Sequence, residues 1–81
     1  MRVLAGFVAE NLMSDFAVRS EWPGTGATEG SAQQAGIEFP WRVEIVSTPN
    51  SELRRVEIRV LSPEQPPREL RRLVGVVARE S

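Results

Sequence analysis

The sequence contains no cysteine, no histidine and no tyrosine, and all of its basic residues are arginine. Without cysteine the chain has neither a disulfide nor a thiolate that binds a metal or attacks a substrate. Without histidine it lacks the most common metal ligand and general base. These absences argue against an enzyme that works by nucleophilic or acid–base catalysis, and we expect neither a cofactor nor a metal.

Neither sign of charge is in excess, since ten arginines stand against eleven carboxylates and the formal net charge is −1. This balance gives no long-range attraction to nucleic acid or to anionic lipid. No apolar run approaches the ~18–20 residues that span a bilayer, and no signal peptide is visible. With 81 residues the chain is long enough for one domain, residues 1–81, whose margin of stability is thin.

The first eighteen residues, MRVLAGFVAENLMSDFAV, predict a helix over about residues 3–19 that the Trp22-Pro23-Gly24 segment ends. A surface helix in a small domain needs an apolar stripe of roughly 100° to cover its core. On a helical wheel the apolar arc of this helix spans about twice that angle. The excess indicates a second partner, either another chain or a membrane. No N-cap residue precedes Val3, which suggests that a longer helix begins upstream.

After a loop at residues 23–31, the apolar period changes from helical to two. Residues 37–45 alternate strictly and predict a half-buried strand, which pairs with a short strand at about residues 29–34 through a turn at Ala35-Gly36. Pro40 implies an edge position or a bulge, because proline has no N–H to donate.

Two further strands are predicted at residues 55–60 and 70–78. The last one is apolar on both faces, which indicates a central or partly covered strand. The expected fold class is therefore α+β, with one N-terminal helix packed on a four-stranded antiparallel sheet that occupies residues 29–79. The apolar strand face that meets the helix comprises Phe39, Trp41, Val43, Val56, Ile58 and Val60.

Polar clusters in the sequence are better explained as structure than as sites. The predicted outward strand faces carry glutamates beside arginines, and we interpret these residues as cross-strand ion pairs rather than as a catalytic carboxylate pair. The residues are Glu38, Glu44, Glu57, Arg42, Arg55 and Arg59. The glycines after Trp22 miss the dinucleotide-binding spacing, and Asp15, Glu21 and Glu29 match no calcium loop. Acids separate the Arg54-Arg55 and Arg71-Arg72 doublets, which argues against a nucleic-acid surface. Trp22 is expected to cap the open end of the core, although it also suits a partner anchor.

An ordered series of motifs resembles the I-type minor pseudopilins of type II secretion systems. It runs from an Ala-Glu-Asn helix through Trp22-Pro23, a Trp41-Arg42 strand and a Thr48-Pro49 turn to a Leu-Arg-Arg-Val-Glu strand at residues 53–57. The resemblance implies a truncated pilin-like fold and a role in export of folded proteins across the outer membrane. It also implies an upstream membrane helix, cleaved by prepilin peptidase and methylated, which anchors a periplasmic domain in the inner membrane. The implied partners are the J-type and K-type minor pseudopilins at the pseudopilus tip, with the helix as the main contact for J.

The candidate partner-binding residues all lie on this helix, where Leu12 and Phe16 are expected to face the sheet. They are Val3, Leu4, Phe7, Val8, Asn11 and Met13. The polar Asn11 is expected to set the register of the interface. A second hypothesis remains open, in which a small periplasmic binding module recognises a ligand or secreted substrate through loops at residues 23–31 and 62–68.

Overall fold

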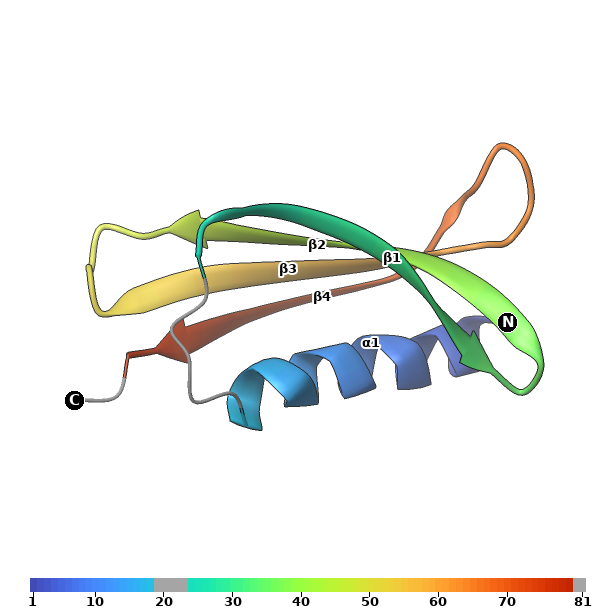
Figure 1. Ribbon diagram of the computed structural model, residues 1–81, viewed down its shortest axis with the longest axis horizontal. Helices are drawn as coiled ribbons and strands as arrows, with labels where there is room; N and C mark the ends of the chain where they lie inside the picture. The colour runs from blue at the N-terminus through green and yellow to red at the C-terminus, as the bar shows by residue number, and fades with distance from the viewer. Residues whose placement is uncertain (19–23, 80–81) are drawn as a thin grey trace.

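A computed structural model describes residues 1–18 and 24–79 of the chain. It contains one helix followed by a four-stranded antiparallel sheet in the order β1-β2-β3-β4, so that each strand pairs with the next (Figure 1). The predicted α+β architecture is confirmed. The elements are α1 (Arg2–Val18), β1 (Gly26–Gln34), β2 (Ile37–Ser47), β3 (Leu53–Leu61) and β4 (Glu69–Ala78).

Helix α1 lies along one face of the sheet beside β4, and β1 curves toward the N-terminal half of the helix (Figure 1). Small and β-branched side chains at a helical spacing, Ala5, Val8 and Ala9, face the strands. Opposite them lie alternate residues of the two middle strands, because successive strand side chains point to opposite faces. The core comprises Ala5, Val8, Ala9, Phe39, Val43, Ile45, Val56, Ile58 and Val60.

The β1–β2 hairpin turns at Ala35 and Gly36, as predicted. Both residues have positive φ angles, 53° and 77°, which is the geometry of a two-residue hairpin turn that matches the twist of the strands. Beside the turn, Gln34 pairs with Ile37. The pairing of β1 with β2 continues without a shift to Gly26, which lies opposite Ile45. The expected loop to residue 31 is therefore wrong, because backbone pairing with β2 extends the strand through residues with little strand preference of their own.

The inner face of β1 carries only small side chains where it meets the large side chains of β2. Gly30 pairs with Trp41, and a Cβ atom on Gly30 would lie 2.6 Å from Cζ2 of the indole. The Trp41 ring therefore lies over the backbone of Gly30. The indole is half-buried and packs against the core, on the same strand face as Phe39.

Two positional expectations for the strands have different outcomes. Pro40 pairs with Ser31 of β1 but precedes Trp41, where the β2–β3 pairing begins, so β2 is paired on one side only at the proline. The expected edge position is thus correct locally. β4 is an edge strand rather than a central one, although α1 partly covers its inner face at Leu73 and Val77. The position of Trp22 and the side chain of Phe16 lie outside what the structure describes.

Candidate partner-binding surface on the helix

An exposed ridge runs along the side of α1 that faces away from the sheet. It consists of Val3, Phe7 and Asn11, which are spaced four residues apart and therefore lie one above the other. Val3 is 66% exposed and Phe7 is 48% exposed, although both side chains are apolar. Burial of such side chains elsewhere contributes about 1.5–3 kcal/mol each. The ridge is therefore a surface whose association with another apolar surface is favourable.

The remaining helix candidates divide between the flanks of the ridge and the core. Leu4 is half-buried on one flank. Met13 is half-buried and contacts β4, because its Cε atom lies 3.0 Å from the place where a Cβ of Gly75 would stand. Val8 is only 2% exposed and belongs to the core, so its expected place on the exposed surface is wrong. The helical period places residues 5, 8 and 12 on the sheet side, and Leu12 packs against the core as predicted.

A groove of about 270 Å³ separates the ridge from the edge strand β4. The helix supplies most of its apolar wall, and β4 supplies two arginines. Arg71 reaches across from β4 to the helix, where its Nε donates a hydrogen bond of 3.1 Å to the carbonyl oxygen of Arg2. The lining residues are Val3, Gly6, Phe7, Ala9, Glu10, Arg71, Arg72 and Leu73. Sequence reasoning missed this groove, since no local pattern brings position 71 beside position 2.

The outer face of the sheet carries like charges directly opposite each other, and ion pairs along β3 and diagonally to β4 offset them. Arg59 lies directly opposite Arg42 on one side and Arg72 on the other, while Glu57 lies opposite Glu44. The oxygens of Glu57 lie 2.7 Å from Nη2 of Arg59, 3.5 Å from Nη2 of Arg55 and 3.8 Å from Nη2 of Arg72. The predicted ion-paired face is confirmed around Glu57, and its pairs run along β3 and diagonally to β4.

The hydrogen bond that Arg59 donates to Glu57 is the main cause of a lowered pKa at this carboxyl. Partial burial opposes that effect by raising the pKa, and the charges of Arg72, Arg59 and Arg55 lower it further. Glu57 is therefore held ionised, which suits a structural ion pair and not a proton donor. Within the described ranges, no group of three carboxylates is placed to hold a metal ion.

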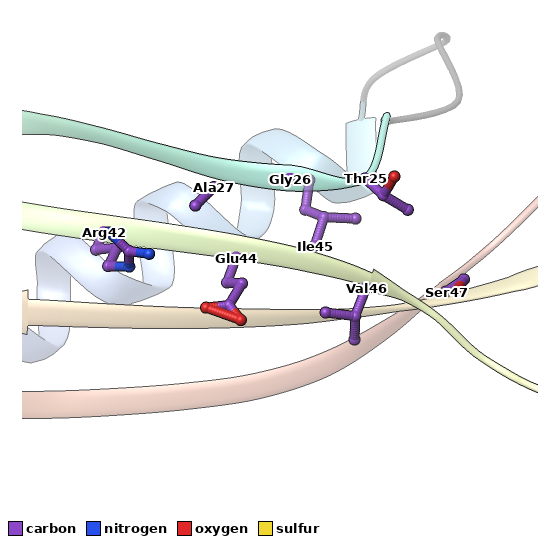
Figure 2. Close-up of a pocket in the computed structure, with 8 residues that line it drawn as sticks. All are labelled: Thr25, Gly26, Ala27, Arg42, Glu44, Ile45, Val46 and Ser47. Carbon is purple, nitrogen blue, oxygen red and sulfur yellow. The ribbon is translucent and has the colours of Figure 1, made fainter.

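A second hollow, of about 460 Å³, lies where the start of β1 meets the end of β2 (Figure 2). Its side chains are spread along the two strands and do not converge on one point (Figure 2). They are Thr25, Gly26, Ala27, Arg42, Glu44, Ile45, Val46 and Ser47. Nearby, Arg42 is directed to Glu29 at 3.6 Å. This arrangement offers no convergent set of polar groups of the kind that orients a small ligand.

The loop at residues 62–68 is closed by its own ends. Ser62 is fully buried, its N–H donates to the carbonyl of Arg68 at 2.7 Å, and its Oγ accepts a hydrogen bond of 2.9 Å from the Arg68 N–H. The hypothesis of a binding module required loops at residues 23–31 and 62–68. The first is a strand from Gly26 onward, and hydrogen bonds between Ser62 and Arg68 close the base of the second, so these segments do not favour ligand binding through loops. The described geometry leaves the helix ridge and its groove as the candidate site.

Comparison with known proteins identifies the family to which the chain belongs. A family profile described as type II secretion system protein I matches residues 1–78. The chain belongs to the type II secretion system protein I family. The resemblance to the I-type minor pseudopilins is thereby confirmed, and with it the secretion-system context.

Relatives with the name type II secretion system protein I come from several bacteria. The protein from Aeromonas hydrophila is 30% identical over 59 residues, which cover 73% of this chain and 50% of the relative. The protein from Pseudomonas aeruginosa is 29% identical over 55 residues, which cover 68% of this chain and 43% of the relative. The chain thus spans about half the length of these curated relatives.

Among solved structures, the fold matches a chain of the crystal structure of the GspK-GspI-GspJ complex from the type 2 secretion system of enterotoxigenic Escherichia coli. The TM-score is 0.79 at 25% sequence identity, and the match covers 95% of this chain and 92% of that chain. The agreement over nearly the whole of both chains supports the pseudopilin fold that the sequence predicted.

Proposed function

We propose that this domain is a non-catalytic assembly subunit of the pseudopilus tip, where it supports export of folded proteins across the outer membrane. Its partners are the J-type minor pseudopilin, bound first, and the K-type minor pseudopilin in a ternary complex. The exposed apolar ridge of α1 carries this proposal, because Val3 and Phe7 stay exposed on a helix whose other side fills the core. The E. coli structure of similar fold is that of a complex of K, I and J subunits.

The ridge has the chemistry of a helix–helix contact. Val3, Phe7 and Asn11 project at a spacing that fits between the ridges of a second helix. Asn11 places one amide within this apolar row, where pairing across the interface fixes the register at some cost in stability. A stable contact of this kind buries about 1,200–2,000 Å² in total, so Leu4 and the groove beside β4 belong to it as well.

The domain is placed on the periplasmic side of the inner membrane, held by a helix continuous with α1 in the full-length protein. The position of the exposed ridge at the N-terminal half of α1 suits that arrangement, since neighbouring anchored helices approach each other there. No helix in the described part of the chain combines the length and apolarity that crossing a membrane requires.

The test compares two glutamate substitutions of exposed apolar residues. Phe7→Glu places a charge on the ridge, whereas Val76→Glu places one on the outer sheet face, where Val76 is 60% exposed and lies opposite Arg55. Binding to the periplasmic domain of the cognate J-type pseudopilin is measured by isothermal titration calorimetry. We expect Phe7→Glu to abolish binding and Val76→Glu to leave it unchanged. Undiminished binding of Phe7→Glu, or loss only after substitutions in residues 62–68, would contradict the proposal.

A further inference from the structure

The groove between α1 and β4 has walls of different chemistry. On the helix side, Val3, Phe7 and Ala9 present apolar surface, with Gly6 leaving space between them. On the strand side, Arg71 extends from the same face of β4 as Leu73, whereas Arg72 lines the groove from the outer face of the sheet, where it pairs with Glu57 and Glu69. Glu10 is the acidic residue of the lining and belongs to the helix wall. An occupant of this groove therefore meets apolar contacts on one side and positive charge on the other.

The two arginines differ in how their charge is balanced. Arg72 lies 3.5 Å from the Glu69 carboxylate and 3.8 Å from that of Glu57. Arg71 forms no ion pair with any carboxylate among residues 1–18 and 24–79, and its hydrogen bond goes to the backbone carbonyl of Arg2. The groove thus contains one cation, Arg71, that pairs with no carboxylate in the described part of the chain.

The position of Arg71 is fixed by the elements around it. Its register partner is Val60 on the core side of β3, so the side chain leaves the inner face of the edge strand. The guanidinium then crosses the helix at Gly6, where an added Cβ would lie 3.5 Å from Nε of Arg71. Anchored at Arg2 and in contact with the glycine, the charge is held at the rim of the groove and remains exposed.

A partner that covers this groove removes water from the guanidinium. An arginine that loses its water without gaining an acceptor is costly, whereas a carboxylate pairs with it in a bidentate geometry. The occupant therefore needs an apolar surface with an acidic residue at one edge. Extended strand addition to β4 would leave the apolar helix wall uncovered, so a helix fits the groove better.

We propose that the groove receives the helix of the J-type pseudopilin and that a carboxylate on that helix pairs with Arg71. This inference rests on the proposed function, and it assigns Arg71 as a specificity-determining residue of the interface. The apolar ridge supplies affinity for any apolar helix, while Arg71 selects the helix that carries an acid at the matching place.

The experiment measures the dissociation constant of the cognate J-type periplasmic domain for five proteins: wild type, Phe7→Glu, Arg71→Glu, Arg71→Gln and Arg68→Glu. Arg68→Glu is the matched control, because it makes the same charge change in the loop at residues 62–68, and Arg68 does not line the groove. We expect Arg71→Glu to weaken binding by about 10- to 100-fold and Arg68→Glu by less than about threefold. Arg71→Gln should weaken binding less and should flatten the dependence of binding on NaCl concentration.

A charge exchange supplies the decisive readout. Each Asp and Glu of the J-type helix is changed to arginine in turn, and one of these variants should bind Arg71→Glu at least tenfold more tightly than the unchanged J-type domain does. Thermal unfolding monitored by circular dichroism confirms that each variant is folded. If Arg71→Glu does not fold, Arg71→Gln and its salt dependence replace it.

The outcomes separate this inference from the function on which it rests. If Phe7→Glu loses binding while Arg71→Glu behaves like Arg68→Glu, the assembly role stands and the acidic pairing is overturned. If no charge exchange restores binding, or if only the K-type domain responds to Arg71, the assignment to the J-type helix is overturned. Unchanged binding of both Phe7→Glu and Arg71→Glu overturns the proposed function itself.

Discussion

Gly30 and Trp41 are direct cross-strand neighbours, and the indole of Trp41 occupies the space that a side chain at position 30 would need. This relationship explains why a glycine stands in the middle of the nine-residue strand β1. Glycine weakens a strand interior by its flexibility, so its presence there needs a reason such as close approach. Here the reason is a tryptophan that partly covers the core.

Substitution of Gly30 by alanine should therefore destabilise the domain. The new Cβ would lie 2.6 Å from Cζ2 of a large ring, so the indole or the strand must shift, and we expect a loss of about 1–3 kcal/mol in the free energy of unfolding. Gly75→Ala is the matched control, because its Cβ meets only the flexible end of Met13. Urea unfolding followed by circular dichroism measures both, and equal losses would contradict the role of Trp41.

The two sides of α1 should respond differently to loss of a valine side chain. Val8 is 2% exposed, so Val8→Ala removes buried methyl groups and should cost about 1–2.5 kcal/mol of unfolding free energy. Val3 is 66% exposed, and Val3→Ala should change stability by less than about 0.5 kcal/mol. Both values come from urea unfolding of the isolated domain. A larger loss at Val3 than at Val8 would mean that the helix is rotated from the position described.

The ion pairs of Glu57 should contribute to stability in a pH-dependent way. Its pKa lies below its ordinary value of 4.5, so the folded protein binds a proton at this carboxyl at lower pH than the unfolded chain does. The stabilisation is complete above about pH 5.5 and declines as the pH falls through about 4.5 toward the folded pKa. The difference in unfolding free energy between wild type and Glu57→Gln should therefore be largest near pH 7 and should shrink toward pH 3. A difference that stays constant with pH would contradict this account.

Ser62 should matter more than its place next to a proline-rich loop suggests. Ser62→Ala removes the acceptor of the Arg68 N–H while leaving the backbone hydrogen bond between the same two residues. We expect a loss of about 0.5–1.5 kcal/mol in unfolding free energy. Ser47→Ala, at an exposed position at the end of β2, serves as the control and should be near neutral. Proteolysis of the 62–68 loop should accelerate in Ser62→Ala alone.

Local sequence patterns were sufficient to predict strand β2, which buries one of its two faces, and the turn that precedes it. The strict alternation from Ile37 to Ile45 predicts β2, and the Ala35-Gly36 pair predicts its hairpin turn; both are confirmed. The beginning of β1 was missed because Gly26 and Thr28 carry no apolar signal and are held by pairing with β2. Apolar residues on both faces of β4 left a central strand and a partly covered one as alternatives; the structure has the second, since β4 is an edge strand with Leu73 and Val77 packed against the core and Val76 exposed.

The division of the helix into core and exposed sides also lies beyond local patterns. Phe7 and Val8 are adjacent and both apolar, so their hydrophobicity alone does not decide between them, although the expected sheet contact of Leu12 favours Val8, four residues before it. The sheet decides between them, because α1 lies close to β4 and Met13 fits against Gly75. Arg71 illustrates the same limit, since its approach to Arg2 depends on the register of an edge strand at the other end of the chain.

The small inner face of β1 has a consequence for the motions of the domain. No residue of β1 is fully buried and most of the strand is exposed, so few buried groups of its own resist its separation from β2. Opening of this edge should therefore require much less free energy than global unfolding. Among the strands, amide hydrogen exchange should be fastest in β1 and slowest in β3. The helix, β3 and β4 would then stay folded together while β1 opens locally.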